Sequence, residues 1–227
     1  DRAELRRLNL KSITLLQALR ERCQSPATPL VISGAIGPRC DGYKAGIATA
    51  AEAEDYHAEQ IATFADSAAD MVCAYTMNSI AEGIGVANAA RKLAMPAAIS
   101  FTVETDGRLA TGETLREAIE ATDEATDGWP AYYMINCAHP THFAPSLGRG
   151  EAWTRRILGI KANASRKSHA ELDEATELDA GDPVELGRQY RVLARRHPAL
   201  RVLGGCCGTD HRHVAAICDA VHGAGRF

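Results

Sequence analysis

The sequence predicts an α/β fold, and more narrowly a (β/α)8 TIM-type barrel that here lacks its first two strands. Short apolar runs alternate strictly with helical patterns, which is typical of a parallel sheet covered by helices. Glycines and polar residues cluster directly after these runs, where barrels and open doubly wound sheets both carry their chemistry. A nucleotide-binding open sheet is disfavoured, because no Gly-x-Gly-x-x-Gly motif follows the first strand and no phosphate loop with a lysine is present. Such barrels normally take about 250 residues. Six strand units within residues 1–227, which begin with a helix, therefore indicate a single partial barrel domain.

The first half of the chain supplies three of the expected strands. A helix runs from Asp1 to about Gln24, because leucines recur there at roughly helical spacing among arginines and glutamates. Prolines end this helix, and the apolar run Pro29–Gly34 is the first expected strand. The elements that follow are a helix from Thr49 or Ala50 to Ala69, a strand at 70–74, a helix at 80–93, a strand at 97–103 and a helix from Glu113 to about Thr126.

The second half continues the same alternation. Its expected elements are a strand that ends at Cys137, a strand near 157–160, a helix at 183–196, a strand that ends at Cys206 and a final helix from about Asp210 to Val221. Thr209 or Asp210 is the expected N-cap of that last helix. The longest stretch without a clear element is Asn163–Asp182, an acidic and polar loop of the kind that lies over a site.

Composition and charge exclude several classes of protein. The formal net charge is −4 and no block of lysines and arginines is interleaved with aromatics, which argues against a nucleic-acid binder. No apolar stretch is long enough to span a bilayer and no signal peptide opens the chain, so we expect a cytoplasmic protein with no membrane partner. The seven cysteines are an odd number spread over a large chain. They favour reduced thiols with metal or catalytic use over a disulfide framework.

Two adjacent cysteines lie among glycines in Gly204–Thr209, directly after an apolar run. A disulfide between neighbours closes a small strained ring and is disfavoured, whereas two thiolates in a backbone that bends tightly suit a soft metal such as Zn²⁺. Cys137, at the end of the run 132–137, offers a third sulfur. Because the carboxyl ends of parallel strands converge at one edge, we expect the three sulfurs to meet. The cysteines at 23, 40, 73 and 218 are expected to be plain core or surface thiols.

Four motifs follow one another along nearly the whole chain. They are Gly34–Pro38, Ile99–Val103 with Gly107 and Gly112 after it, Asn136-Cys137, and Gly204–Thr209. In this order they resemble the homocysteine S-methyltransferase family. The resemblance implies a barrel in which Cys137, Cys206 and Cys207 hold zinc and leave a fourth position for the substrate thiol. The family's opening strand, with an Asp-Gly-Gly-x-x-Gly-Thr-like turn, and its Thr-Asn-Thr-Tyr-like second strand are absent here. Both help to form the amino-acid pocket in the family.

A second departure concerns the fourth strand of the family, which usually ends in Glu-Thr. That glutamate looks like the residue that grips the substrate's amino group. Tyr75-Thr76 stands at this place here, although Glu82 fits the helix that follows in the family. A neutral tyrosine cannot supply the same charge, which leaves the identity of the acceptor open, and Glu104 is a candidate to compensate. The other candidate substrate-binding residues are Asn136, His139, Asn163 and Gly205.

Several polar residues near the expected site have simpler alternative roles. Asn136 and Asn163 either orient the substrate or close turns. His139 is expected to line the pocket or to pack beneath a loop, with zinc ligation as the lesser alternative. His211 and His213 fall in the first turn of the last helix, where capping or surface roles are expected.

The chemistry that follows from the resemblance is activation of a thiol. A thiol such as that of homocysteine is mostly protonated at neutral pH, whereas Zn²⁺ deprotonates a coordinating thiol. Three protein thiolates leave one tetrahedral position open, as catalytic zinc sites do. We therefore expect a zinc-dependent S-methyltransferase of the EC 2.1.1 class, which moves a methyl group to homocysteine and gives methionine. The donor is S-methylmethionine, S-adenosylmethionine or a betaine, and the sequence does not choose among them.

Two other functions stay open at this point. One is a methyltransferase that acts on another thiol, and the other is a non-catalytic barrel that binds zinc but no thiol. A barrel short of two strands exposes sheet edges and an apolar core, so we also expect the chain to be unstable alone or to associate, for example as a homo-oligomer.

Overall fold

A computed structural model, which describes residues 1–223, shows one parallel sheet whose strands lie in sequence order, β1-β2-β3-β4-β5-β6. The strands are β1 (Ser33–Ile36), β2 (Met71–Met77), β3 (Ala97–Phe101), β4 (Tyr132–Asn136), β5 (Ile157–Ala162) and β6 (Val202–Gly205). The helices are α1 (Arg2–Cys23), α2 (Ala50–Ala65), α3 (Ile80–Lys92), α4 (Leu115–Thr126), α5 (Pro140–Phe143), α6 (His169–Asp173), α7 (Pro183–Arg196) and α8 (His211–His222), with a 3-10 turn, η1, at Trp153–Arg156.

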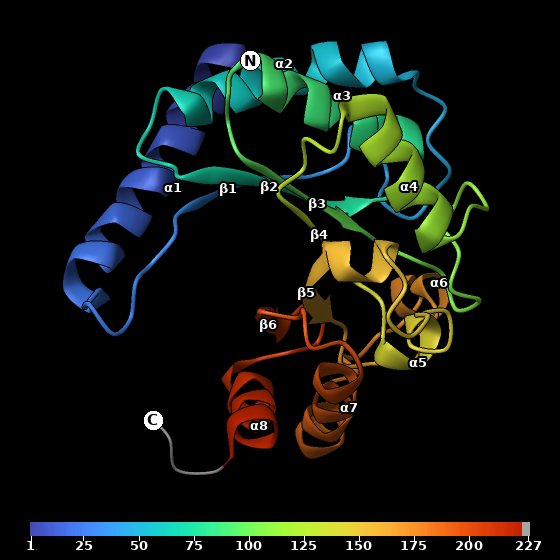
Figure 1. Cartoon of the computed structure of the whole chain (residues 1–227). Helices are drawn as coiled ribbons and strands as arrows, with labels where there is room; N and C mark the ends of the chain where they lie inside the picture. Colours follow the sequence, from blue (N-terminus) through green and yellow to red (C-terminus); the bar gives the residue numbers. More distant parts are fainter. Residues whose placement is uncertain (224–227) are drawn as a thin grey trace.

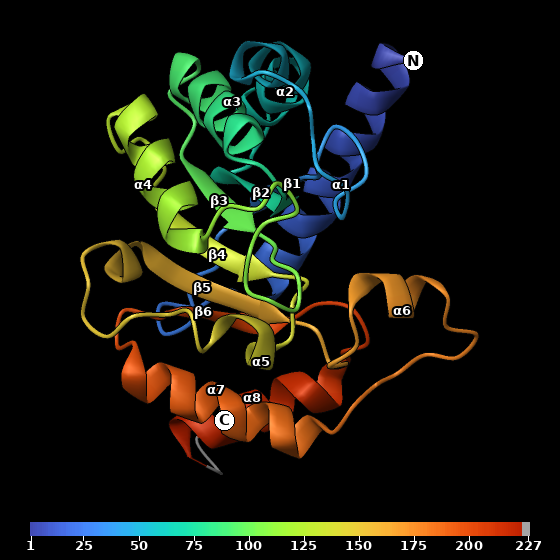
Figure 2. The same cartoon turned by 90° about the vertical axis from the view of Figure 1, so that its right-hand side faces the viewer.

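The sheet is curled and open. Its strands follow one another along an arc, with the helices on the outer side (Figure 1). α1 packs on α2, α2 on α3 and α3 on α4, while α7 packs on α8. A view turned by 90° shows the helices α1–α4 and the pair α7 and α8 on either side of the strands (Figure 2). Within residues 1–223, β1 and β6 have one strand neighbour each. The strand–helix alternation is thus confirmed, and the architecture is the open, curled part of a TIM-type barrel.

The two faces of the sheet bury different cores. The outer face carries the main core against the helices, with fully buried side chains such as Ile36, Ile99 and Ile160. A smaller cluster lies on the inner face and contains Cys73, Ala98 and Met134, packed with the partly buried residues Met71, Tyr75, Tyr132 and Val202. β3 is buried at all of its positions, as expected for a parallel strand that is covered on both faces.

Reciprocal caps set where several helices begin. At α2 the Thr49 side chain accepts from the Glu52 amide, and the Glu52 carboxylate accepts from the Thr49 amide. At α8 Asp210 and His213 form the same arrangement. Asp210 is therefore the N-cap, which selects one of the two expected residues. The start of α8 is fixed directly after the adjacent cysteine pair.

Some expected boundaries were wrong in the first half of the chain. The β1 ladder begins at Ser33 instead of Pro29. Just before it, the Ile32 amide donates to the Asp70 carboxylate at 2.6 Å, so a side chain takes the place of a strand partner. β2 continues to Met77, past the expected end at residue 74, and its register with β3 shifts where Thr76 has a φ of +60°.

Other differences concern helices. The stretch 163–182 contains the short helix α6, which Ser168 caps by accepting from the Glu171 amide. α5 and η1 were not expected, and α2 ends at Ala65 instead of Ala69. In the part of the chain that the structure describes, none of the helices has both the length and the apolar character needed to cross a membrane.

Candidate metal centre

Three cysteine sulfurs lie together at the carboxyl edge of the sheet, as the strand-end geometry predicts. Cys137 follows β4 directly, and Cys206 and Cys207 follow β6. The Cys137 Sγ lies 2.6 Å from the Cys206 Sγ and 3.8 Å from the Cys207 Sγ, and all three sulfurs are within 4.8 Å of one another. β5 lies between these two strands and holds them in place. The Cys137 amide donates to the Lys161 carbonyl at 3.2 Å, and the Cys206 amide donates to the Ala162 carbonyl at 2.8 Å.

The backbone is bent at both turns that carry the sulfurs. Cys137 has a φ of +53°, a left-handed conformation that is uncommon for a residue with a side chain. Such conformations persist only where the surroundings hold them, and they concentrate at functional sites. Gly208 has a φ of +76°, and a Cβ at this position would lie 2.7 Å from the Asp179 carbonyl oxygen. A Cβ at Gly205 would overlap the Thr209 side chain. The predicted Gly205 therefore serves the tight turn.

Hydrogen bonds among the three cysteine thiols shift their pKa values in opposite directions. Hydrogen bonds from Cys206 and Cys207 lower the pKa of the Cys137 thiol strongly, and hydrogen bonds from Tyr43 and Thr76 add to that shift. The hydrogen bond to Cys137 is also the largest cause of the raised pKa values of Cys206 and Cys207. These opposite pKa shifts favour the thiolate form at the buried Cys137 over the other two cysteines.

This donor set fits a zinc ion. Zinc–thiolate bonds of about 2.3 Å at tetrahedral angles place sulfurs about 3.8 Å apart, which is the observed separation of the Cys137 and Cys207 sulfurs. The closer pair, Cys137 and Cys206, would have to separate by about 1 Å around a metal. Exposure increases from the buried Cys137 through Cys206 to the exposed Cys207. The cluster is therefore reachable from the side of Cys207.

Asn136 links three strand ends directly beneath the cluster. Its Oδ1 accepts from the Thr76 amide at 2.9 Å and from the Ser100 hydroxyl at 2.6 Å, and its Nδ2 donates to the Thr76 Oγ1 at 2.8 Å. The same Nδ2 lies 4.0 Å from the Cys206 Sγ. With 1% of its surface exposed, Asn136 holds the ends of β2 and β3 against β4. The predicted residues Asn136 and Thr76 thus lie together at the centre.

Asn163 joins the two turns that carry the sulfurs. Its Nδ2 donates to the Cys137 carbonyl at 2.9 Å, and its Oδ1 accepts from the Cys207 amide at 3.1 Å. Because Asn163 is buried, these two bonds fix the backbone of two cluster cysteines relative to each other. Of the two alternatives for this residue, the closing of turns is what the geometry displays.

Tyr43 and His169, which sequence reasoning missed, reach the cluster from two loops. His169, at the start of α6, lies with its Nε2 2.6 Å from the Cys137 carbonyl and its Nδ1 3.0 Å from the Glu104 carboxylate. The Tyr43 ring stacks on His169 with the ring centroids 3.9 Å apart. Burial raises the pKa of Tyr43, and its hydroxyl hydrogen-bonds to Cys137. Glu104 is thus connected to the site through its contact with His169.

The loop that carries Tyr43 is held by buried side chains. Asn78 Nδ2 donates to the carbonyls of Asp41 and Lys44 at 2.9 and 2.7 Å. Glu82 accepts from the Arg39 amide at 2.5 Å and lies 3.0 Å from the His57 Nε2. Glu82 therefore holds the loop from outside, and none of the hydrogen bonds it forms in the described structure reaches the cysteine cluster.

The remaining predicted residues lie near the cluster without joining it. Tyr75 is half-buried on the inner face of the sheet, and its hydroxyl accepts from the Lys161 ammonium at 2.9 Å. His139 is buried, caps α5 and lines a cavity of about 210 Å³ with Ser165 and Asp179. Burial is the main cause that lowers its pKa to about 4. His213 is also buried, 2.8 Å from the Ala180 carbonyl, which supports its capping role and rules out a surface role.

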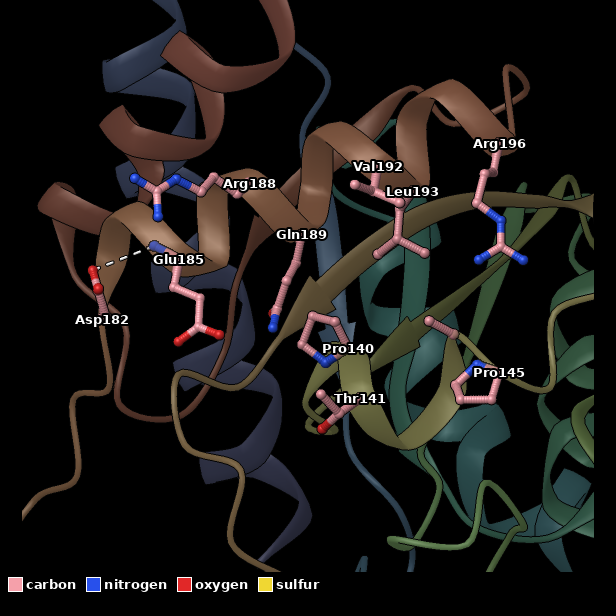
Figure 3. A pocket seen from close by; sticks show the side chains of 11 residues that line it. Pro140, Thr141, Pro145, Asp182, Glu185, Arg188, Gln189, Val192, Leu193 and Arg196 are labelled. Atoms are coloured by element: carbon pink, nitrogen blue, oxygen red, sulfur yellow. Dashed lines mark hydrogen bonds between the residues drawn. The ribbon is translucent and has the colours of Figure 1, made fainter.

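The cavity drawn in Figure 3 has a volume of about 670 Å³ and lies between α5 and α7. Pro140 and Thr141 face Gln189 and Leu193 across it, and charged side chains lie towards both ends of α7. The residues that line this cavity do not include any of the three clustered cysteines. Its size alone therefore does not link it to the candidate metal centre.

Comparisons with known proteins bear on the fold and the family. The model of a family described as homocysteine S-methyltransferase matches residues 1–221. Among solved structures, the metallated form of the homocysteine methyltransferase MmuM from Escherichia coli superposes with a TM-score of 0.71 at 18% identity, covering 96% of this chain and 71% of that one. The oxidized form gives 0.71 at 20% identity, with the same coverage. The apo form gives 0.69 at 20%, covering 97% of this chain and 74% of that one. At these identities the superpositions support the fold.

Proposed function

From the premise that this chain belongs to the homocysteine S-methyltransferase family and is a methyltransferase, we propose that it is a zinc-dependent enzyme that methylates the sulfur of homocysteine. The observation that carries the proposal is the meeting of Cys137, Cys206 and Cys207, whose sulfurs lie within 4.8 Å of one another. These three residues would hold the metal. When bound, zinc would supply a Lewis acid that keeps a coordinating thiol deprotonated at neutral pH.

The chain's own residues would prepare the site. Asn163 holds the backbones of Cys137 and Cys207 together, and Asn136 holds the strand ends beneath them. Tyr43 and His169 cover the cluster from two loops, which would limit the access of water. Outer groups of this kind orient metal ligands and tune their basicity.

The transfer itself would be a direct displacement. The sulfur of the acceptor thiolate forms a bond to the methyl carbon while the donor's carbon–sulfur or carbon–nitrogen bond breaks. The electron pair of that bond stays on the leaving group, whose positively charged sulfur or nitrogen atom thereby becomes neutral. The acceptor thiol has given up its proton before this step. Positioning of the two reactants would be the main contribution of the protein.

Metal analysis tests this proposal directly. Reduced protein purified without chelator is expected to contain one zinc per chain, which Cys207→Ser should remove. Cys218→Ser is the matched control, because Cys218 is a half-buried free cysteine on α8 outside the cluster. In cobalt-substituted protein, homocysteine should shift the thiolate-to-cobalt absorption band. The absence of stoichiometric metal from reduced protein would refute the proposal.

The same experiment separates the two alternatives. Zinc that responds to other thiols but not to homocysteine would indicate a methyltransferase with a different acceptor. Zinc that responds to no thiol would indicate a non-catalytic zinc-binding barrel. For a homocysteine-responsive protein, methionine formation with S-methylmethionine, S-adenosylmethionine and a betaine in turn would identify the donor.

A further inference from the structure

Lys161 is a cation on the inner face of the sheet, next to the cysteine cluster. In the β4–β5–β6 register it pairs with Asn136 on one side and with Gly204 on the other. Cys137 comes one residue after Asn136, and Cys206 comes two residues after Gly204. Because neighbouring strands lie about 4.8 Å apart, both cysteines lie close to Lys161. Lys161 therefore occupies the layer of the inner face immediately below the sulfurs.

The path of the Lys161 side chain is visible from its contacts. A Cβ added at Gly204 would lie 3.4 Å from the Lys161 Cγ and 3.7 Å from its Cε, which is ordinary van der Waals contact, so the lysine stem lies alongside β6 at this position. The ammonium group ends at Tyr75 of β2, 2.9 Å from its hydroxyl and 4.7 Å from the centre of its ring. The Lys161 and Tyr75 side chains thus meet over the concave face and together connect β5 with β2.

Among residues 1–223, no carboxylate forms an ion pair with this ammonium. Its hydrogen-bond partner in this part of the chain is the Tyr75 hydroxyl, and the nearest carboxylates lie more than 4.0 Å away. The phenol does not neutralise it, because burial raises the pKa of Tyr75 and keeps the hydroxyl uncharged. An ammonium offers three donors, of which Tyr75 takes one. A half-buried lysine with this environment is suited to bind an anionic group of a ligand.

We propose that Lys161 binds a carboxylate carried by the acceptor thiol, and so makes this enzyme select thiols with an anionic group over thiols with a cationic one. The proposal rests on the proposed function, since it places the acceptor sulfur at the cysteine cluster. The competing explanation is that Lys161 balances the negative charge of the thiolates without touching the substrate. A third explanation is that Lys161 binds a carboxylate of the methyl donor.

Two matched thiols separate these explanations without any methyl donor. 3-Mercaptopropionate and cysteamine both have a two-carbon chain, and they end in a carboxylate and an ammonium respectively. Their dissociation constants are measured from the thiolate-to-cobalt band of cobalt-substituted protein at one pH. The variants are Lys161→Met, which keeps the length of the side chain without its charge, and Lys161→Arg, which keeps the charge. Unfolding by urea is followed in parallel, so that variants which fail to fold are recognised.

The expected result concerns the ratio of the two dissociation constants, compared between wild type and variant. The different acidities of the two thiols cancel in that comparison, because they are the same for both proteins at one pH. Lys161→Met should weaken 3-mercaptopropionate relative to cysteamine by about 10-fold, as for one charge-assisted hydrogen bond, and Lys161→Arg should keep most of the preference. A ratio that stays unchanged while both thiols weaken together would overturn the inference in favour of charge balance. An unchanged ratio with both affinities intact would overturn it as well and would point to the donor. Wild-type protein without a cobalt band would refute the proposed function itself, and the inference with it.

Discussion

Removal of the Asn163 side chain should lower the free energy of unfolding and, through a separate effect on the cysteine backbones, also weaken zinc binding. Asn163→Ala deletes two hydrogen bonds, one to the Cys137 carbonyl at 2.9 Å and one from the Cys207 amide at 3.1 Å. Neither partner is then stranded, because the Cys137 carbonyl still has the His169 Nε2 at 2.6 Å and Cys207 is exposed to water. At about 1 kcal/mol for each bond, the free energy of unfolding should fall by about 2 kcal/mol.

The effect on the metal has a different origin. Asn163 fixes the backbones of two of the three proposed ligands relative to each other, so its loss lets them separate. Loss of such an outer partner typically weakens metal binding by about 10- to 100-fold. The zinc dissociation constant, measured by competition with a chromophoric chelator, should rise by that factor, and urea unfolding of the metal-free protein gives the stability.

Tyr133→Phe is the matched control for the Asn163 prediction. Tyr133 also lies in a buried environment on β4, but its hydroxyl donates to the Asp123 carboxylate at 2.7 Å, away from the cysteines. This variant should lose about 1 kcal/mol of stability with the zinc affinity unchanged. If Asn163→Ala were to lose about 2 kcal/mol yet bind zinc within twofold of the wild type, its positioning role would be refuted.

Three further predictions concern other parts of the site. Tyr43→Phe removes the hydroxyl that contacts Cys137; the thiolate-to-cobalt band should move and zinc binding should weaken by about 10-fold, and an unmoved band would contradict this role. Gly208→Ala places a Cβ 2.7 Å from a carbonyl oxygen at a φ of +76°. It should lower the free energy of unfolding by more than about 1 kcal/mol and lose zinc. Gly223→Ala is the control, because its φ is also positive, at +89°, but it has open space around it, and it should keep the metal. Burial is the main reason why the pKa of His139 in the folded protein is about 4, below its ordinary value of 6.5. The folded state should therefore lose stability as the pH falls from 6.5 towards 4. His139→Asn can still cap α5 and should reduce that loss, as measured by urea titrations at pH 7 and 4.5.

The clustered cysteines could be predicted from the sequence because their meeting depends on topology alone. Cys137 and Cys206 each follow a parallel strand with β5 between them. Any sheet with this order brings such strand ends to one edge, whatever the side chains nearby. The same logic located Asn136, which is the last residue of β4. A short apolar run and the few residues after it were enough to place these groups.

The outer residues could not be found in this way, because their positions depend on the path of loops. Tyr43 reaches the cluster only because Asn78 holds the carbonyls of Asp41 and Lys44. His169 reaches it because Ser168 starts a short helix in a stretch that has no strong pattern of its own. Neither contact has a fixed spacing along the chain. Capping by Ser168 and Glu171 was the one readable feature of the 163–182 stretch.

The role proposed for Lys161 depends on the register of the sheet and cannot be inferred from its neighbours in the sequence. In the sequence it stands alone between Ile160 and Ala162, with no acidic or aromatic neighbour to suggest a role. The ladder aligns it with Asn136 and Gly204, and the curl of the sheet brings its ammonium to Tyr75, which is 86 positions away. The family that the chain resembles usually carries a glutamate at the place of Tyr75, whereas the structure has a neutral hydroxyl there with the Lys161 ammonium 2.9 Å away. If Lys161 binds the acceptor's carboxylate as proposed, the inner face prefers anionic thiols, and the comparison of 3-mercaptopropionate with cysteamine tests that preference.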